Sequence, residues 1–198
     1  MNKKIILASG SPRRREILEN IGLDFSVSVS NADEGSVLPE GIPVGIYVQE
    51  LAMLKAAASA KTAERGALVI GADTVVSLDG KILTKPTDEN DAFEMLMALS
   101  GKTHEVYTGI CVTDTSDMKS VCRSACTKVT FSPLTEKIVR AYIQTGEPSD
   151  KAGAYGIQGK GALLVEKIDG DYFNVVGLPV KLLSEILRDE FDFEVFGV

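Results

Sequence analysis

The sequence predicts a mixed α/β protein, because strand-like apolar runs alternate with amphipathic helical patterns along its 198 residues. Asp79-Gly80 and Asp169-Gly170 are turn signals of the kind that join antiparallel strands. The helical stretches between other strand patterns suit crossovers. Both kinds of connection together favour a mixed sheet. Since 44% of the residues are hydrophobic and no linker-like segment interrupts the chain, we expect one domain over residues 1–198.

The first third of the chain predicts a strand, a helix, a second strand and a long helix. Residues 3–8 form a short apolar run, and residues 12–20 follow Ser11 and Pro12, which are a good N-cap and a good first helical residue. A further strand is expected at 24–30 and a polar, turn-rich loop at 31–41. Apolar residues at helical spacing predict a helix over 43–63.

The middle of the chain predicts two hairpins that flank a helix. The apolar run 67–78 turns at Asp79-Gly80 into a return strand at 81–84. Thr87 or Asp88 can cap a helix that ends at Leu99 before Ser100-Gly101. Alternating stretches over 103–113 and 119–132 predict the second hairpin.

The last third predicts a helix, a glycine-rich loop, a strand and a terminal helix. The helix is expected at 135–145 and the loop at 147–161. A strand at 162–168 turns back at Asp169-Gly170, and the last helix is expected at 179–189.

The overall composition excludes several classes of protein. The formal net charge of −7 argues against binding to long nucleic acids, which needs a broad basic face. No apolar stretch reaches membrane-spanning length, and the amino-terminal run is too short for a signal peptide, so we expect no membrane association and a cytoplasmic location. The three cysteines lack Cys-x-x-Cys spacing and cannot form a zinc site with His104, the only histidine. We expect them to be reduced, partly buried thiols, and His104 to be structural.

The loop before the first helix has the character of an anion site. Helix amides should point into Ser9-Gly10-Ser11, yet Arg13, Arg14 and Arg15 occupy the same turn, where cations oppose the helix dipole. A bound anion would reverse that penalty. The alternative is that the arginines extend into solvent.

Asp73 lies inside an otherwise apolar run. An ionised carboxylate is costly to desolvate there unless a cation or a metal meets it. Gly71 and Ala72 leave room beside it, which suits a ligand that approaches the strand closely. The alternative is a capping or pairing role within the core.

Two lysines are candidates for the cation near Asp73. A two-residue turn at Asp79-Gly80 would pair Thr74 with Lys85, which places Lys85 level with Asp73 but on the opposite face, so convergence needs a bulge or a strand end. Lys55 lies beside the apolar stripe of the long helix, where it could also be a lysine that extends to solvent.

The remaining candidates are the acidic pair Asp33-Glu34 and the glycine-rich segment 152–159, in which Gln158 supplies an amide that can donate and accept hydrogen bonds. Such a segment can bind a ligand or simply turn the chain, and it matches no standard phosphate-binding fingerprint. Taken together, the residues suggest a polyphosphate held by Arg13, Arg14, Lys55 and Lys85. With only oxygen ligands available from Asp73 and Asp33-Glu34, magnesium or manganese is the favoured cation.

The chain resembles the Maf family of nucleotide pyrophosphatases along almost its whole length. The resemblance is carried by Ala8-Ser-Gly-Ser-Pro-Arg-Arg14, Asp33-Glu34, Lys55, Gly71-Ala-Asp-Thr-Val-Val76, Lys85-Pro86, Leu99-Ser-Gly-Lys102 with His104, Asp150-Lys-Ala-Gly-Ala-Tyr-Gly-Ile-Gln-Gly159, and Gly177-Leu-Pro179. It implies a Maf/Ham1-like (ITPase-like) α/β fold with two lobes around a cleft. It also implies hydrolysis of a nucleoside triphosphate to the monophosphate and pyrophosphate with a divalent cation. A homodimer is common in the family.

The resemblance also implies a role for each site residue. Asp73 matches the family's proton acceptor, which takes a proton from water or holds the metal that polarises it, and Glu34 matches a metal-site carboxylate. The residues that match phosphate-binding positions are Ser9, Ser11, Arg13, Arg14, Lys55 and Lys85.

Three positions separate the branches of the family. The branch that hydrolyses dTTP and UTP has arginine, threonine and glutamine where this chain has Arg13, Thr74 and Gln158, whereas the 7-methyl-GTP branch has a large aromatic residue, glutamine and glutamate. We therefore expect dTTP and UTP as substrates. Two alternatives stay open: a pyrophosphatase for purine or modified nucleotides, and a non-catalytic nucleotide sensor that regulates cell division.

Overall fold

The chain forms two compact units in a computed structural model that describes residues 3–196. Unit 1 contains the residues up to Asp73, Thr108–Ala125 and the residues from Gly177 onward. Unit 2 contains Thr74–Tyr107 and Cys126–Val176. The two units correspond to the two lobes expected above, whereas the cleft and the single domain over residues 1–198 stay predictions. Residues 1, 2, 197 and 198 of that domain lie outside the described range.

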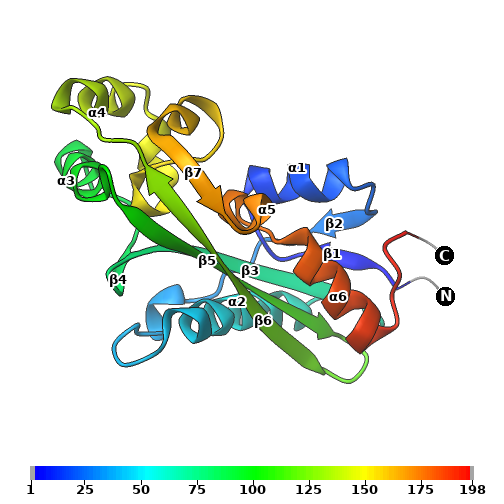
Figure 1. Ribbon diagram of the computed structural model, residues 1–198. Coiled ribbons are helices and arrows are strands. Elements are labelled where there is room, and N and C mark those ends of the chain that lie inside the picture. Colours follow the sequence, from blue (N-terminus) through cyan, green and yellow to red (C-terminus); the bar gives the residue numbers. More distant parts are fainter. Residues whose placement is uncertain (1–2, 197–198) are drawn as a thin grey trace. The chain divides into compact units, whose positions relative to one another are not determined.

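The described strands belong to one sheet with the order β2-β1-β3-β5-β6-β7, and β4 pairs with β3 (Figure 1). The strands are β1 (Ile5–Leu7), β2 (Phe25–Val27), β3 (Leu68–Leu78), β4 (Lys81–Leu83), β5 (Thr103–Asp114), β6 (Ser120–Phe131) and β7 (Val165–Asp169). β1 pairs in parallel with β2 and β3, whereas β3–β4 and β6–β7 are antiparallel. The predicted α/β class with a mixed sheet is confirmed.

The helices agree with the predicted ones, with one addition. They are α1 (Pro12–Asn20), α2 (Val44–Ala60), α3 (Glu89–Leu99), α4 (Glu136–Ile143), α5 (Tyr172–Val176) and α6 (Val180–Phe191), and the 3₁₀ turns are η1 (Glu34–Ser36), η2 (Glu147–Asp150), η3 (Ala152–Ala154) and η4 (Gly159–Leu164). The short α5 was not predicted. None of the helices within residues 3–196 combines the length and the apolar character needed to cross a membrane.

One predicted strand begins too early. Residues 162–164 were expected in a strand but belong to η4, and β7 begins only at Val165. The glycine-rich run therefore continues in short turns beyond Gly161, because Ala162 and its neighbours close 3₁₀ hydrogen bonds, such as the one from Val165 N to Ala162 O.

Side chains at the predicted positions cap two of the helices. The Asp88 carboxylate accepts a hydrogen bond from Asp91 N at 2.8 Å and begins α3. The Thr135 hydroxyl accepts from Ile138 N and begins α4. Ser11 does occupy the N-cap position of α1, followed by Pro12, but its side chain makes no capping bond. The first amides of α1 therefore have no side-chain cap from Ser11.

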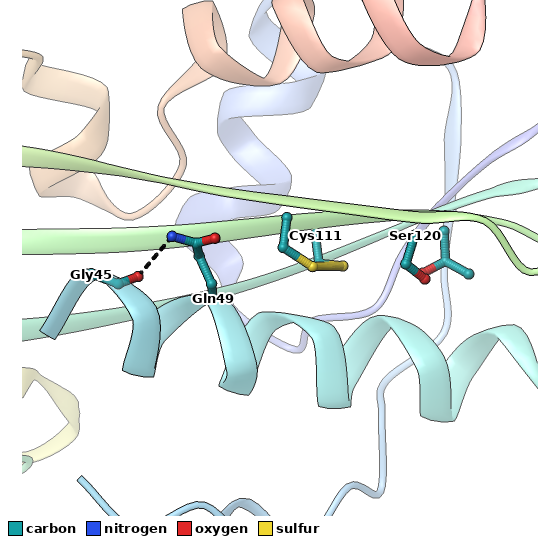
Figure 2. Close-up of a disulfide and its surroundings, with 6 residues drawn as sticks. Gly45, Gln49, Cys111 and Ser120 are labelled. Carbon is teal, nitrogen blue, oxygen red and sulfur yellow. Dashed lines mark hydrogen bonds between the residues drawn. A yellow bond between two sulfur atoms is a disulfide. The ribbon is translucent and has the colours of Figure 1, made fainter. Parts of the chain in front are cut away.

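Each unit has an apolar cluster of its own. In unit 1, alanines of α2 pack against β1 and β3, and Cys111 of β5 belongs to the same cluster. In unit 2, Leu96 and Leu99 of α3 pack with Phe131 of β6 and with Tyr142 of α4. Figures 1 and 2 both show the strands of unit 1 between α2 on one side and α6 on the other.

The cysteines differ from the prediction. Cys111 and Cys122 form a disulfide across the β5–β6 hairpin, with their Cα atoms 4.1 Å apart, and only Cys126 is a free, exposed thiol. Figure 2 shows the Cys111 side chain in the space between its strand and α2. The expectation of three reduced thiols is therefore wrong. The reason is the hairpin register: Thr113 and Ser120 are hydrogen-bonded neighbours at 2.9 Å, which places Cys111 opposite Cys122 two residues further along each strand.

Candidate active site

The loop between β1 and α1 is organised around the buried side chain of Arg14. Its Nε donates to Gly177 O at 2.8 Å, and its Nη1 donates to Ser9 Oγ at 3.0 Å. Ser9 Oγ also accepts a hydrogen bond from Ser11 N at 3.3 Å. Arg14 is 9% exposed, so it does not extend into solvent as the alternative prediction held. Arg15 does follow that alternative, because it is exposed and pairs with Glu19.

The charges around Arg14 connect this loop to the predicted acidic residues. Burial lowers the pKa of the Arg14 guanidinium from its ordinary value, the carboxylates of Asp73 and Glu34 oppose that shift, and the neighbouring charge of Arg13 adds to it. Opposite charges that act on one buried group must lie near it. The structure therefore brings together the arginines of α1 and two of the predicted carboxylates.

Asp73 meets a cation, as predicted for a carboxylate in an apolar strand. Lys55 Nζ lies 2.6 Å from Asp73 Oδ1, and both side chains are 13% exposed. The same ammonium lies 3.1 Å from Glu34 Oε2. Lys55 thus joins a carboxylate of β3 to one of η1, and it is not a lysine that extends to solvent. Asp73 and Thr74 are the half-buried residues in β3, whose other residues are buried.

The glycines beneath α2 explain how Lys55 reaches Asp73. A Cβ on Gly71 would clash with Ala52 O and with Ala56 N of α2, and a Cβ on Gly109 of β5 would clash with Val48 O. The helix backbone therefore lies directly on β3 and β5, at a distance that side chains would prevent. The sequence interpretation of Gly71 was wrong in one respect: α2 fills the space beside it, and no room for a ligand remains at that position.

The two residues of the acidic pair, Asp33 and Glu34, make different contacts. The Asp33 carboxylate accepts a hydrogen bond from Gly35 N at 3.2 Å and caps η1, whereas Glu34 turns to Lys55. No group of three or more His, Cys, Asp or Glu side chains suited to a metal occurs within residues 3–196. The oxygen donors of Glu34 and Asp73 fit a hard cation such as Mg²⁺, which typically binds one or two carboxylates and completes its shell with water and substrate phosphate.

Lys85 lies in unit 2 and follows the end of a strand. The predicted two-residue turn is confirmed, because Leu78 pairs with Lys81 in the β3–β4 register. β4 ends at Leu83, and Thr84 O accepts a hydrogen bond from Gly153 N at 3.1 Å. The alternation rule that would have placed Lys85 on the face opposite Asp73 therefore does not apply, since Lys85 is exposed and lies beyond the strand.

Gln158 is exposed on the glycine-rich segment of unit 2. It occupies the N-cap position of η4, yet its side chain makes no capping bond. Gly153 and Gly159 have φ values of 66° and 67°, which glycine tolerates without strain. Thr74, the other residue of this unit predicted to influence the choice of base, is half-buried and directly follows Asp73 in β3.

His104 is structural, as predicted. Its Nε2 lies 2.7 Å from the Tyr155 hydroxyl, and its ring meets Phe131 and Tyr155 edge-on. Its Nδ1 is buried without a hydrogen-bond partner, and burial lowers the pKa of His104 to about 4. The imidazole is therefore neutral at physiological pH and supports the segment that carries Gln158.

The sequence interpretation missed Tyr47 as a neighbour of the acidic residues. Burial raises the pKa of the Tyr47 phenol, and the carboxylates of Asp73, Glu34 and Glu40 raise it further. The phenol is thus protonated beside these carboxylates. The signal was present, since Tyr47 lies two turns before Lys55 on α2.

The comparisons with known proteins agree with the resemblance described above. The family model for "Maf-like protein" matches residues 4–190. A dTTP/UTP pyrophosphatase of Clostridium novyi is 52% identical over 186 residues, which cover 94% of this chain and 97% of the relative. A protein of the same name from Thermoanaerobacter pseudethanolicus is 53% identical over 189 residues, covering 96% and 97%.

Two further matches extend the comparison. A dTTP/UTP pyrophosphatase of Acetivibrio thermocellus is 51% identical over 192 residues, covering 94% of both chains. A solved nucleoside-triphosphatase (dITP/XTP pyrophosphatase) from Mycobacterium abscessus aligns with a TM-score of 0.43 and 15% identity over 65% of this chain and 74% of that chain. On the family model and the near full-length relatives, this chain belongs to the Maf family.

Proposed function

We propose that this chain hydrolyses the α–β phosphoanhydride of dTTP and UTP and releases the nucleoside monophosphate and pyrophosphate. The observation that carries the proposal is the ion pair of Asp73 and Lys55, which places a carboxylate and its counter-charge in an otherwise buried strand. Relatives about 50% identical over nearly their whole length have the name dTTP/UTP pyrophosphatase.

Asp73 acts on the attacking water in this proposal. The water oxygen forms a bond to phosphorus while the bond to the bridging oxygen breaks, and Asp73 accepts the water proton. A neutral carboxylic acid could not do this. The Lys55 ammonium, 2.6 Å from Asp73 Oδ1, supplies the counter-charge for this carboxylate in the strand.

Cations and hydrogen-bond donors bind the phosphates. We assign this role to Ser9, Ser11, Arg13, Arg14 and Lys55 in unit 1, and to Lys85 in unit 2. Arg14 is the best supported of them, because it is buried, bonded to Ser9 and electrostatically linked to the carboxylates. Fixed cations of this kind offset the negative charge that develops on the departing pyrophosphate.

A divalent cation, magnesium or manganese, belongs to the proposed reaction. Asp73 and Glu34 would hold it, with the remaining positions left to water and phosphate oxygens. When bound, such an ion polarises a phosphate oxygen or lowers the pKa of a coordinated water.

Base choice depends on Arg13, Thr74 and Gln158. Gln158 supports this assignment because its amide is exposed and does not cap η4. An amide can pair with the adjacent donor and acceptor edge of thymine or uracil. The competing assignment is that Gln158 contacts the phosphates.

The cytoplasmic location and a homodimer also stay predictions. The Cys111–Cys122 disulfide argues against the first of them, since disulfides are rare in the cytosol. Counting the thiols of protein taken directly from cells tests the location: three thiols per chain would support a reducing compartment, and one thiol would oppose it.

The function is tested by incubating the protein with dTTP or UTP and either metal, then separating the products. The proposal predicts monophosphate and pyrophosphate in equal amounts. Release of diphosphate and orthophosphate would contradict the assigned bond. Tight nucleotide binding without any product would instead support the alternative of a non-catalytic sensor.

A further inference from the structure

We propose that Glu147 and Tyr142 are positioning residues that hold the segment carrying Gln158, and that they thereby set the choice of base. The inference rests on the proposed function, since it assumes that Gln158 reads the base. Glu147, Tyr142 and the segment all belong to unit 2.

Glu147 caps η4 from a distance in the sequence. One of its carboxylate oxygens accepts from Lys160 N at 3.2 Å, and the other accepts from Gly161 N at 3.2 Å. These amides belong to the first turn of η4, where a helix has no internal acceptors for its N–H groups. The N-cap residue normally supplies that acceptor. Here the N-cap residue is Gln158, whose side chain makes no capping hydrogen bond, and the Glu147 carboxylate is the acceptor instead.

Tyr142 joins Glu147 to the other end of the segment. The Tyr142 hydroxyl accepts a hydrogen bond from Gly156 N at 3.2 Å, and the nearby Glu147 carboxylate acts on it electrostatically. Burial raises the pKa of Tyr142 to about 12, so its hydroxyl is protonated at neutral pH and can donate to the carboxylate. Gln158 therefore lies between two anchored points, Gly156 and Gly161.

The glycines show how closely the segment folds around these two side chains. A Cβ on Gly159 would lie 3.0 Å from Glu147 Oε1, and a Cβ on Gly161 would lie 2.7 Å from the Tyr142 hydroxyl and would clash with Gly156 O. Lys151 Nζ adds a hydrogen bond to Glu147 O at 2.6 Å, which fixes the backbone at Glu147. The arrangement holds the backbone of Gln158 in one conformation before any ligand binds.

Ordering a recognition group in advance lowers the entropy that binding must overcome. Removing the carboxylate or the hydroxyl leaves backbone N–H groups unpaired and frees the segment, so the Gln158 amide samples several orientations. The residues of unit 1 proposed to bind phosphate belong to a different compact unit from Glu147, so we expect them to keep their function. We therefore expect the variants to lose recognition of the base and to keep binding of the phosphates.

The experiment uses the full chain with Glu147→Gln and Tyr142→Phe, and with Glu136→Gln as the matched control. Glu136 is exposed in the first turn of α4 and pairs only loosely with Arg140, at 3.7 Å. We measure kcat and KM for dTTP and ATP, and inhibition by dTMP and by pyrophosphate. Loss of an acceptor for the partly buried Gly161 N or Gly156 N predicts about a tenfold fall in the dTTP-to-ATP ratio of kcat/KM, mostly through KM for dTTP.

Inhibition separates positioning from a general loss of structure. Binding of dTMP should weaken about as much as KM for dTTP rises, whereas inhibition by pyrophosphate should not change, because pyrophosphate carries no base. In a Gln158→Ala background the effect of Glu147→Gln on the ratio should disappear, as expected when one residue acts through another. Glu136→Gln should leave all of these values unchanged.

The possible failures are distinct. If the wild-type protein shows no preference for dTTP over ATP, the proposed base specificity is wrong, and so is this inference. If the wild type has the preference but Glu147→Gln and Tyr142→Phe retain it, or lose dTTP and ATP activity equally, only the positioning role is wrong. Tyr142→Phe removes a single oxygen, so it tests the positioning role even if Glu147→Gln does not fold.

Discussion

The side chain of Asp73 in unit 1 and the segment of unit 2 that carries Gln158 are held in place by different contacts. Asp73 is fixed by an ion pair with Lys55, between a helix and a strand that pack directly on each other at Gly71. Gln158 is exposed, and the backbone on either side of it donates hydrogen bonds, from Gly156 N to the Tyr142 hydroxyl and from Gly161 N to the Glu147 carboxylate. We therefore expect that hydrolysis and base choice can be impaired separately. The proposed role of Asp73 in hydrolysis depends on charge between packed elements, whereas the proposed role of Gln158 in base choice depends on the conformation of a short segment.

Asp73→Asn tests the chemical half of the comparison and should have the largest effect. The amide keeps the volume but loses the charge required to accept a proton or hold a metal, so kcat should fall at least roughly 100-fold. The unfolding temperature should stay close to that of the wild type. Asp79→Asn, in the turn that ends β3, is the matched control and should keep full activity. Substantial activity in folded Asp73→Asn would remove Asp73 from the mechanism.

Arg13→Ala and Lys85→Ala should have the next largest effect. Each removes a charge-assisted contact to phosphate, which is worth roughly 1.5–3 kcal/mol, so kcat/KM should fall about 10- to 100-fold for every nucleotide tested. The ratio between dTTP and ATP should hold for Lys85→Ala. Arg15→Ala is the control, because Arg15 is exposed in the same turn and pairs with Glu19. Variants that unfold readily but keep wild-type kinetics would assign these cations a structural role.

His104 gives the smallest of the expected effects, on stability in unit 2. Burial lowers its pKa in the folded chain to about 4, against an ordinary value of 6.5, so below pH 6.5 the unfolded chain binds more protons than the folded one. Stability should therefore fall as the pH is lowered from 6.5 towards 4. Between pH 7 and 5.5 this contribution is about 1 kcal/mol.

The measurement for His104 is the free energy of unfolding in urea at both pH values. His104→Gln should lose less stability on acidification than the wild type, because the amide does not titrate. An identical loss in both proteins would show that other groups dominate and that His104 is not the neutral support of Tyr155 described above.

Much of unit 1 could be predicted from the sequence, because some of its residues would be energetically unfavourable without a specific partner. An aspartate within a buried strand requires a cation, and Lys55 on the neighbouring helix was one of two candidates. The bounds of α1 followed from Ser11 and Pro12 at its start. Gly71 was recognised as a point of close approach, but the sequence could not reveal that a helix, and not a ligand, approaches there.

The supports of Gln158 and the disulfide could not be predicted in the same way, since both depend on contacts between distant positions. Glu147 has no unusual neighbours in the sequence, and its role appears only when its carboxylate reaches Lys160 and Gly161. The predicted hairpin placed Cys111 and Cys122 on neighbouring strands, but it did not define which residues pair. What was missing was the exact turn, which determines which residues face each other.

The role of Gln158 in base choice is tested most sharply by comparing the wild type with Gln158→Glu in one assay, using dTTP, UTP, ATP, GTP and 7-methyl-GTP. We expect the wild type to hydrolyse dTTP and UTP with higher kcat/KM than the purine nucleotides. Gln158→Glu should lose that advantage, because a carboxylate lacks the donor of the amide and repels the phosphates. A wild-type preference for 7-methyl-GTP, or an unchanged dTTP preference in Gln158→Glu, would contradict the claim that this segment of unit 2 selects the base.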